Sequence, residues 1–224
     1  MKGGLTDMET LINADYKTVD IPKDAIIVID PPFNIGYHYR SYADKIKEES
    51  YYDELAKLVR DRKAVVIHYP EALHKLSIKL GYAPTRVVSW VYNSNTGRQH
   101  RDIAFYDIKP NFKQVIQPYK NPTDKRIKER IARGILGGGL YDWFNINQVK
   151  NVSKKEITHP CVMPVEVMKN IVGILPKGSL IVDCFMGSGT TGIACKQLGY
   201  DFIGIEIDPV YYEEAKKRIN YEIF

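Results

Sequence analysis

The sequence predicts an α/β fold with a doubly wound, mostly parallel sheet. Short, near-continuous apolar runs alternate along the chain with longer segments of helical character, as buried parallel strands alternate with helices. At 224 residues, 44% of them hydrophobic, the chain is long enough for one such core and an insertion. No apolar run reaches the roughly 18 residues of a membrane span, and the first nine residues are polar. We therefore expect a cytoplasmic protein without a membrane segment.

Each element is predicted from its apolar pattern and from the residues that flank it. Asp208 is an N-cap candidate, followed by Pro209 at the first helical position. Lys216, Lys217 and Arg218, near the end of that helix, are expected to complement its dipole. The predicted strands are residues 25–30, 64–69, 86–92, 103–108, 180–183 and 202–206. The predicted helices are residues 48–60, 70–80, 123–132, 165–175, 190–198 and 209–220.

The cysteines are Cys161, Cys184 and Cys195. Their number is odd and their spacing does not match a metal site, so free thiols and no metal are expected. Cys161 follows a proline, as does the nucleophile of cytosine-C5 methyltransferases. It precedes a helix rather than following a strand, which argues against that role.

Asp30, Pro31, Pro32 and Phe33 follow the first predicted strand. The carboxyl ends of strands in an open α/β sheet are where ligands gather. The prolines fix φ and lack N–H groups, so the turn is stiff and its carbonyls have few internal partners. A carboxylate and a free carbonyl can accept both hydrogens of one amino group, while Phe33 can stack on a flat heterocycle. This predicts a site for the exocyclic amine of a nucleobase, with an ordinary strand-to-loop turn as the alternative.

A Gly-x-Gly turn, Gly187-Ser188-Gly189, joins the strand that ends at Asp183 to the helix at 190–198. Glycines let the backbone approach a ligand, and the helix start offers unpaired N–H groups. Glu206 ends the next strand, 23 positions after Asp183, where an acidic residue commonly binds ribose hydroxyls. The third glycine of the dinucleotide fingerprint is absent, which favours a nucleoside over a pyrophosphate. A packing turn without a ligand is the alternative.

Together these segments resemble an amino-group DNA methyltransferase of the N6-adenine/N4-cytosine type, in the permuted order that places the catalytic motif first. Residues 30–34 are similar to the catalytic D-P-P-Y/F motif, 183–191 to the S-adenosylmethionine motif, and 204–209 to the acidic strand end. Residues 159–175 resemble the helix before the cofactor strand. The resemblance covers about residues 14–107 and 158–223, and it implies a Rossmann-like class I methyltransferase fold.

The resemblance also implies the site residues. Asp30, Pro31, Pro32 and Phe33 would be catalytic, and His159, next to a proline, would be either a cofactor contact or structural. S-adenosylmethionine would be held by Asp183, Phe185, Gly187, Ser188, Gly189, Thr190, Thr191 and Glu206.

The implied chemistry is methyl transfer to an amine. The N6 amine of adenine is a poor nucleophile because its lone pair is delocalised into the ring. Hydrogen bonds to the Asp30 carboxylate and the Pro31 carbonyl would favour a pyramidal nitrogen, so transfer from the sulfonium needs positioning rather than a covalent intermediate. The base must flip out of the duplex to reach the site.

We therefore expect a site-specific DNA adenine-N6 methyltransferase, of the kind found in restriction–modification. An N4-cytosine enzyme stays open, because the preference for adenine rests on the family's use of Asp at position 30. A catalytically inactive DNA-binding module would need neither Asp30 nor the glycine turn, and an NAD-dependent oxidoreductase would not need Asp-Pro-Pro-Phe. The motif order disfavours an RNA or protein-amide methyltransferase.

A basic insertion separates the two motifs. Residues 109–155 contain 11 Lys or Arg and 3 Asp or Glu, in a chain of net charge +5. Double-stranded DNA is the expected partner, with a solvated charged segment as the alternative. Gly134 and residues 137–139 are expected to be flexible joints. The aromatic residues between the charges are Phe112, Tyr119, Tyr141, Trp143 and Phe144.

We assign residues 111–157 to target recognition, and residues 1–110 and 158–224 to the catalytic and cofactor parts of one domain. The insertion is short, which leaves open a minimal recognition site or a partner subunit, such as a second copy in a homodimer. The polar-aromatic loop at 34–47, with Tyr37, His38, Tyr39, Arg40 and Tyr42, would close over a flipped base or grip the DNA backbone. Disorder is the alternative.

Overall fold

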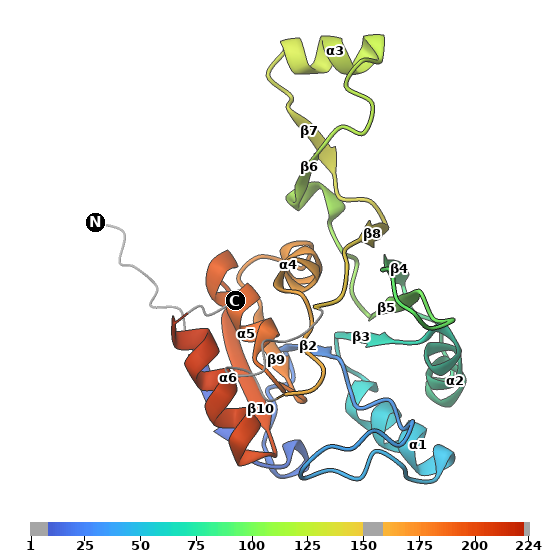
Figure 1. The fold of residues 1–224 in the computed structure, drawn as a ribbon, viewed down its shortest axis with the longest axis vertical. Coiled ribbons are helices and arrows are strands. Elements are labelled where there is room, and N and C mark those ends of the chain that lie inside the picture. The colour runs from blue at the N-terminus through green and yellow to red at the C-terminus, as the bar shows by residue number, and fades with distance from the viewer. Residues whose placement is uncertain (1–8, 150–158, 222–224) are drawn as a thin grey trace.

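An eight-stranded sheet crosses the centre of the protein in the computed structural model, which describes residues 9–149 and 159–221 (Figure 1). From β1 to β3 all neighbouring strands are parallel, and β4 and β8 are parallel to each other. In order across the sheet the strands are β1 (Glu9–Asn13), β10 (Asp201–Glu206), β9 (Leu180–Asp183), β2 (Ile26–Ile29), β3 (Ala64–His68), β5 (His100–Tyr106), β4 (Arg86–Val91) and β8 (Trp143–Asn145).

Strand β5 runs antiparallel to both of its neighbours, β3 and β4. Its apolar run suggested one more parallel strand, and that interpretation was wrong. A strand buried on both faces shows the same apolar run in either direction, so the run alone does not report direction. The connection does report it, because residues 92–99 are too few for the helical crossover that two parallel strands require.

Helices cover both faces of the sheet, as expected for a doubly wound fold. Helices α4 (Val165–Gly173), α5 (Thr190–Leu198) and α6 (Pro209–Tyr221) share one core with Ile26 and Val28. Helices α1 (Glu48–Val59) and α2 (Pro70–Leu80) share the other with Ile27 and Ile29. The alternation of β2 side chains between two apolar layers confirms the predicted α/β architecture. Within the described ranges, no helix has both the length and the apolar character needed to cross a bilayer.

The predicted helix at 209–220 is present, and the Asp208 carboxylate caps it by accepting from the N–H groups of Val210 at 2.8 Å and Tyr211 at 3.2 Å. Arg218 lies in the last turn of this helix, as predicted. Arg218 is buried, and its guanidinium donates to the carbonyl of Ser188 in the glycine turn. Arg218 therefore faces inward and supports that turn.

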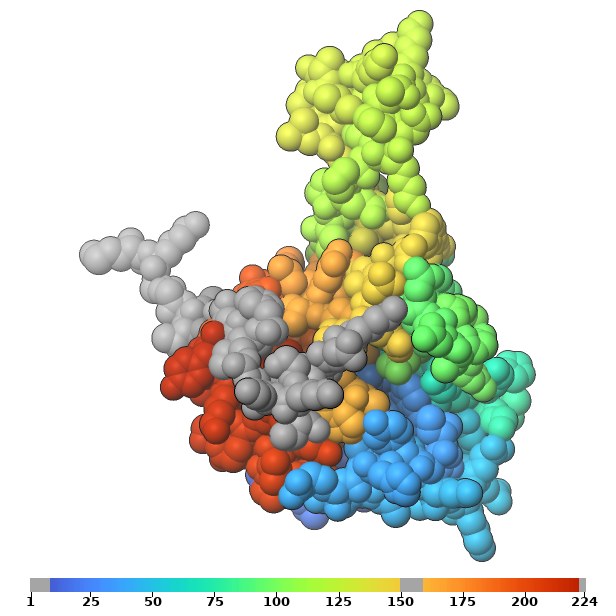
Figure 2. All heavy atoms as spheres, viewed as in Figure 1, coloured from blue at the N-terminus to red at the C-terminus, as the bar shows by residue number. Residues whose placement is uncertain are grey.

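The basic insertion forms an arm that stands away from the body (Figure 1, Figure 2). After a short 3-10 helix (Phe112–Gln114), strands β6 (Ile116–Pro118) and β7 (Gly137–Gly139) pair as an antiparallel ribbon that carries α3 (Lys125–Ala132) at its tip. Asp124 caps α3 by accepting from Arg126 N at 2.9 Å. Residues 137–139 are therefore a strand and not flexible joints. A Cβ on Gly137 would lie 2.4 Å from the Gln117 carbonyl oxygen, so close pairing requires glycine there.

Strand β1 and the 3-10 helix after it (Tyr16–Thr18) were not predicted. The apolar stretch of β1 is short, and within the described ranges no strand pairs with its outer edge. Strand β1 pairs with β10, and Asn13 Nδ2 donates to the Glu206 carbonyl at 2.8 Å. Lys150, Lys154 and Lys155, which contribute to the predicted basic segment, lie outside the described residues.

Candidate active site

The Asp30 carboxylate lies at the carboxyl end of β2, next to a second acidic strand end. Strands β2 and β9 are parallel neighbours with Ile27 opposite Val182, so Asp30 and Asp183 emerge at the same edge of the sheet. Asp30 Oδ1 is buried and has no hydrogen-bond partner. Burial raises the pKa of Asp30 to about 6, and the nearby Arg101 guanidinium acts in the opposite direction. The turn therefore presents a carboxylate with an open acceptor atom.

Tyr51 and His68 form a hydrogen-bond network with the turn at residues 30–33. Tyr51 Oη donates to the Pro32 carbonyl at 2.7 Å and lies 2.9 Å from His68 Nε2. The backbone N–H of Tyr69 donates to His68 Nδ1 at 2.8 Å. Since Nδ1 accepts, Nε2 carries the proton of a neutral ring, and burial lowers the His68 pKa to about 3. These bonds fix the Pro32 carbonyl, whereas no donor among the described residues bonds to the carbonyl of Pro31.

The Phe33 ring packs beside this network. Its centroid lies 4.5 Å from the His68 ring and 4.9 Å from the Tyr69 ring. The Arg101 guanidinium lies over it at 4.6 Å. Phe33 is therefore positioned by aromatic contacts and faces a cation.

The glycine turn between β9 and α5 is organised by two carboxylates. Asp183 accepts from Thr191 Oγ1 at 2.5 Å and from Phe185 N at 2.9 Å. Glu206 accepts from Gly187 N at 2.7 Å and from Asp208 N at 2.9 Å. Burial raises the pKa of Asp183 to about 7 and also raises that of Glu206.

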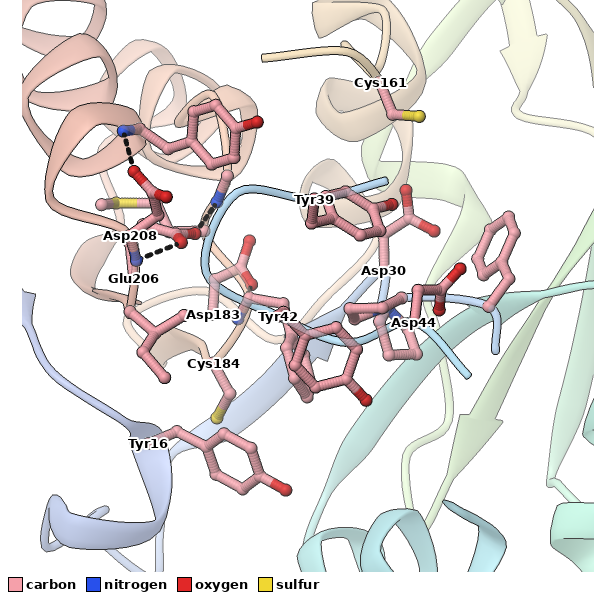
Figure 3. Close-up of a pocket in the computed structure, with 18 of the residues that line it drawn as sticks. Tyr16, Asp30, Tyr39, Tyr42, Asp44, Cys161, Asp183, Cys184, Glu206 and Asp208 are labelled. Atoms are coloured by element: carbon pink, nitrogen blue, oxygen red, sulfur yellow. Dashed lines mark hydrogen bonds between the residues drawn. The ribbon is translucent and has the colours of Figure 1, made fainter. Parts of the chain in front are cut away.

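The two turns open into one pocket of about 350 Å³. Figure 3 shows Asp183, Glu206 and Asp208 on one side of this pocket and Asp30 on the other, with Tyr39 and Tyr42 between them. Most of the sequence-predicted site residues line it: Asp30, Pro31, Pro32, Phe33, His159, Asp183, Phe185, Gly187, Ser188, Thr190, Thr191 and Glu206.

Gly189 is the predicted site residue that does not line the pocket. Its φ is +80°, and a Cβ there would lie 3.0 Å from the Ala215 Cβ and 3.1 Å from Ile219 Cδ1 on α6. Gly189 therefore permits the close packing of α5 on α6. Gly187, with φ +51°, is the glycine whose missing Cβ faces the pocket side, 2.9 Å from His159 Nε2.

Hydrogen bonds from the loop at 34–47 hold it against the pocket. The buried Asp44 carboxylate accepts from the N–H groups of Asn34 at 2.6 Å and Tyr37 at 2.9 Å. Ser41 Oγ donates to Asp208 Oδ2 at 2.5 Å on the other side of the pocket. The loop therefore bridges the pocket from the turn at residues 30–33 to the start of α6.

Sequence reasoning missed several residues that shape this site. Tyr16 and Cys184 line the pocket. The Asp44 carboxylate accepts from the loop backbone, and Tyr51 donates to the turn at residues 30–33. A local pattern does not single out a lone Tyr on a helix or a lone Asp in a loop. Arg101 gave no signal either, because it is one basic residue at the polar start of a strand.

A family model for DNA methylases, N6_N4_Mtase, matches residues 25–217, most of the chain. The chain belongs to the N6/N4 DNA methylase family. The match spans both motifs and the arm between them. It agrees with the resemblance carried by Asp30–Phe33 and by the glycine turn.

This DNA methylase is similar to characterised proteins both in sequence and in structure. It is 24% identical to the type II methyltransferase M.HpaI of Haemophilus parainfluenzae, over 96% of this chain and 72% of that protein. Two solved structures have a similar fold. One is an M1.HpyAVI–SAM complex, with a TM-score of 0.58 and 20% identity over 95% of this chain and all of that one. The other is the cytosine-N4-specific PvuII DNA methyltransferase, with a TM-score of 0.66 and 14% identity over 95% and 86% of the two chains.

Proposed function

We propose that this methylase transfers a methyl group from S-adenosylmethionine to the exocyclic amine of a base flipped out of duplex DNA, with adenine N6 as the target. One observation carries the proposal. Two open acceptors, Asp30 Oδ1 and the Pro31 carbonyl, face the same pocket as the acidic ends of the next strands, Asp183 and Glu206. The amine of a base presents two hydrogens, and this turn presents two acceptors.

The residues of the other half of the pocket fit S-adenosylmethionine. The pocket volume of about 350 Å³ falls within the range of small-molecule sites. The buried Glu206 carboxylate at the end of β10 suits ribose hydroxyls, and Asp183 with the Gly187–Thr191 turn suits the methionine end. When bound, the cofactor supplies an activated methyl group with a good leaving group. Asp183, His159 and Glu206 would hold and orient it.

The residues on the β2 side would orient the amine. Asp30 and the Pro31 carbonyl would each accept a hydrogen bond from one N–H of the amine. The nitrogen lone pair would then be exposed toward the cofactor. Phe33 would stack on the ring, while Tyr51 and His68 keep the turn in place. No proton needs to leave the amine before transfer, because positioning of the two reactants supplies most of the advantage. The nitrogen would gain the methyl group as the carbon–sulfur bond breaks and S-adenosylhomocysteine is released. The methylated nitrogen would then lose its extra proton to the Asp30 carboxylate.

The choice of adenine rests on the family's use of Asp at position 30. The cytosine-N4-specific PvuII methyltransferase has a similar fold, and cytosine's amine presents the same two donors, so N4-cytosine remains the second candidate. Analysis of nucleosides after methylation separates the two.

The test uses the full-length protein, labelled S-adenosylmethionine and long unmethylated duplex DNA of mixed sequence, followed by digestion to nucleosides. We expect N6-methyladenine. Asp30→Ala should lower kcat at least about a hundredfold, as expected when a group acting in the transition state is removed, while S-adenosylhomocysteine still binds. The matched control is Asp24→Ala, an exposed carboxylate just before the same strand. Activity of Asp30→Ala within tenfold of wild type contradicts the assignment, and N4-methylcytosine as the main product contradicts only the choice of base.

We further propose that the arm binds DNA and that residues 111–157 serve target recognition, between the catalytic and cofactor parts at 1–110 and 158–224. The described residues 109–149 carry eight Lys or Arg against three Asp or Glu. At the base of the arm, Lys120 Nζ lies 3.6 Å over the half-exposed Trp143 ring and 4.8 Å over Tyr141. Cations beside exposed rings suit phosphates and bases. The homodimer stays a prediction.

The arm is tested by reversing the charges of Lys125, Arg126 and Arg130 on α3. Binding to all duplexes should weaken, and its salt dependence should flatten by a slope of roughly one per lost phosphate contact. The control reverses Lys57, Lys216 and Lys217, which are exposed on α1 and α6 and change the net charge equally. Equal effects in both triple variants would mean that net charge, and not the arm, governs binding.

A further inference from the structure

The Arg101 guanidinium lies inside the catalytic half of the pocket. It comes from the start of β5, and its side chain is only 13% exposed. Its Nη1 is 3.5 Å from Asp30 Oδ2, and its Cζ lies 4.6 Å over the Phe33 ring and 5.4 Å over the Trp90 ring. A planar, nitrogen-bearing group therefore already contacts both residues that the proposed mechanism assigns to the base.

The contact between Arg101 and Asp30 is incomplete. At 3.5 Å it is longer than a typical charge-assisted bond of about 2.7 to 2.9 Å. Arg101 Nε and Asp30 Oδ1 are both buried without a hydrogen-bond partner. Since burial of unpaired charged groups is unfavourable, this arrangement leaves hydrogen-bonding capacity that an incoming ligand can satisfy.

The guanidinium and a target base compete for the same positions. Both are flat, both place N–H donors against the Asp30 carboxylate, and both would lie against Phe33. We propose that Arg101 is a positioning residue that holds the place of the target base in the DNA-free enzyme and leaves Asp30 when the base enters. This inference rests on the proposed function, because it takes Asp30 and Phe33 as the base site.

The Arg101 guanidinium also affects the charge of Asp30 before DNA binds. Arg101 opposes the burial that raises the Asp30 pKa, so it favours the ionised acceptor in the free enzyme. Other titratable groups also act on or near Asp30 from the elements around it. They are Tyr39 of the loop, Tyr51 of α1, His68 of β3, Tyr92 after β4, Cys161 before α4 and Asp183 of β9. Among Arg101 and these groups, Arg101 is the cation that forms an ion pair with Asp30.

The experiment compares the pH dependence of kcat/KM and of kcat for DNA methylation by wild type and Arg101→Met. The profile of kcat/KM reports the pKa values of the free enzyme, and that of kcat reports those of the enzyme–substrate complex. With Arg101→Met, the acid limb of kcat/KM should move to higher pH by about one pH unit, because an adjacent opposite charge lowers a carboxyl pKa by about 1 to 3. The acid limb of kcat should not move, since Arg101 has already left Asp30 in the complex.

Two further variants complete the design. Arg101→Lys keeps a cation near Asp30 and should restore the wild-type acid limb. Arg98→Met is the matched control, because Arg98 stacks on Tyr69 at 4.2 Å and pairs with Glu71 but is not paired with Asp30. Its two profiles should match those of wild type. Binding of S-adenosylhomocysteine by each variant verifies that it is folded.

The outcomes are distinct. If both limbs move in Arg101→Met, Arg101 stays beside Asp30 during the reaction and the displacement is wrong. If neither limb moves in a folded variant, the guanidinium does not act on Asp30 and the proposal fails. If the wild-type enzyme methylates no DNA, the proposed function itself fails.

Discussion

Gly187 offers a direct test of the cofactor half of the site. It has φ +51°, and a Cβ there would lie 2.9 Å from His159 Nε2 and 3.2 Å from His159 Cε1. Left-handed backbone costs an L-residue about 1 to 2 kcal/mol. Displacing a packed ring adds about 1 to 3 kcal/mol. The His159 ring has little room to move, because it packs on the Tyr211 ring at a centroid distance of 4.6 Å.

Gly187→Ala should therefore lose about 2 kcal/mol or more of stability, and the displaced His159 ring should weaken binding of S-adenosylhomocysteine at least about tenfold, or about 1.4 kcal/mol. Gly178 supplies the matched control. It has φ +74°, but a Cβ there would meet nothing within 4 Å. Gly178→Ala should lose only the backbone part, about 1 to 2 kcal/mol, and bind S-adenosylhomocysteine as wild type does.

Thermal unfolding and isothermal titration calorimetry measure the two effects. For a chain of this size, each kcal/mol corresponds to about 2 to 4 °C in Tm. Gly187→Ala with an affinity within twofold of wild type would refute the view that this turn contacts the cofactor. Equal losses of Tm in the two variants would show that the His159 contact costs nothing.

The remaining predictions concern the turn at residues 30–33 and the loop at residues 34–47. Tyr51→Phe removes the hydrogen-bond donor to the Pro32 carbonyl. It should lower kcat about tenfold and the free energy of unfolding by about 1 to 2 kcal/mol, while the affinity for S-adenosylhomocysteine stays unchanged. An unchanged kcat would mean that the prolines alone hold the turn. Asp44→Ala leaves the loop N–H groups without their acceptor, whereas Ser41→Ala removes one hydrogen bond. In stopped-flow measurements, S-adenosylhomocysteine should therefore dissociate faster from Asp44→Ala than from Ser41→Ala. Equal dissociation rates would show that Asp44 does not control the loop. The kcat/KM of the wild-type enzyme for methylation should rise as the pH passes about 6, where Asp30 loses its proton. A kcat/KM that stays constant from pH 5 to 8 would exclude Asp30 as the titrating acceptor.

The sequence predicted the elements whose ends are marked by strong local signals. Helix α2 begins at Pro70 and is followed by Gly81 with φ +83°, and α5 lies between Gly189 and Gly199, so both helices were predicted with the observed bounds. The apolar run of β9, which ends at Asp183, was predicted equally well. These signals act within a few residues, and they place both turns at the carboxyl ends of strands.

What the sequence did not reveal depends on contacts between distant residues. Strand β5 begins at His100, three residues before its apolar run, because pairing with β3 and β4 extends it. The Arg101 contact with Asp30 joins residues 71 positions apart. Gly189 could not be separated from Gly187 by pattern, since their different roles arise from what lies beside each missing Cβ.

The position of β1 at the sheet edge affects the order in which the chain can fold during synthesis. Strand β1 is synthesised before the other strands of the sheet, but among the described residues it pairs only with β10, at residues 201–206. Contacts between such distant segments form slowly because a long loop must close first. Residues 26–106 can pair strands β2, β3, β5 and β4 while the ribosome is still at work. Strands β9 and β10 follow these strands in the chain. The turn at residues 30–33 can therefore form on a nascent chain before the glycine turn and Glu206, which line the other half of the pocket, are synthesised.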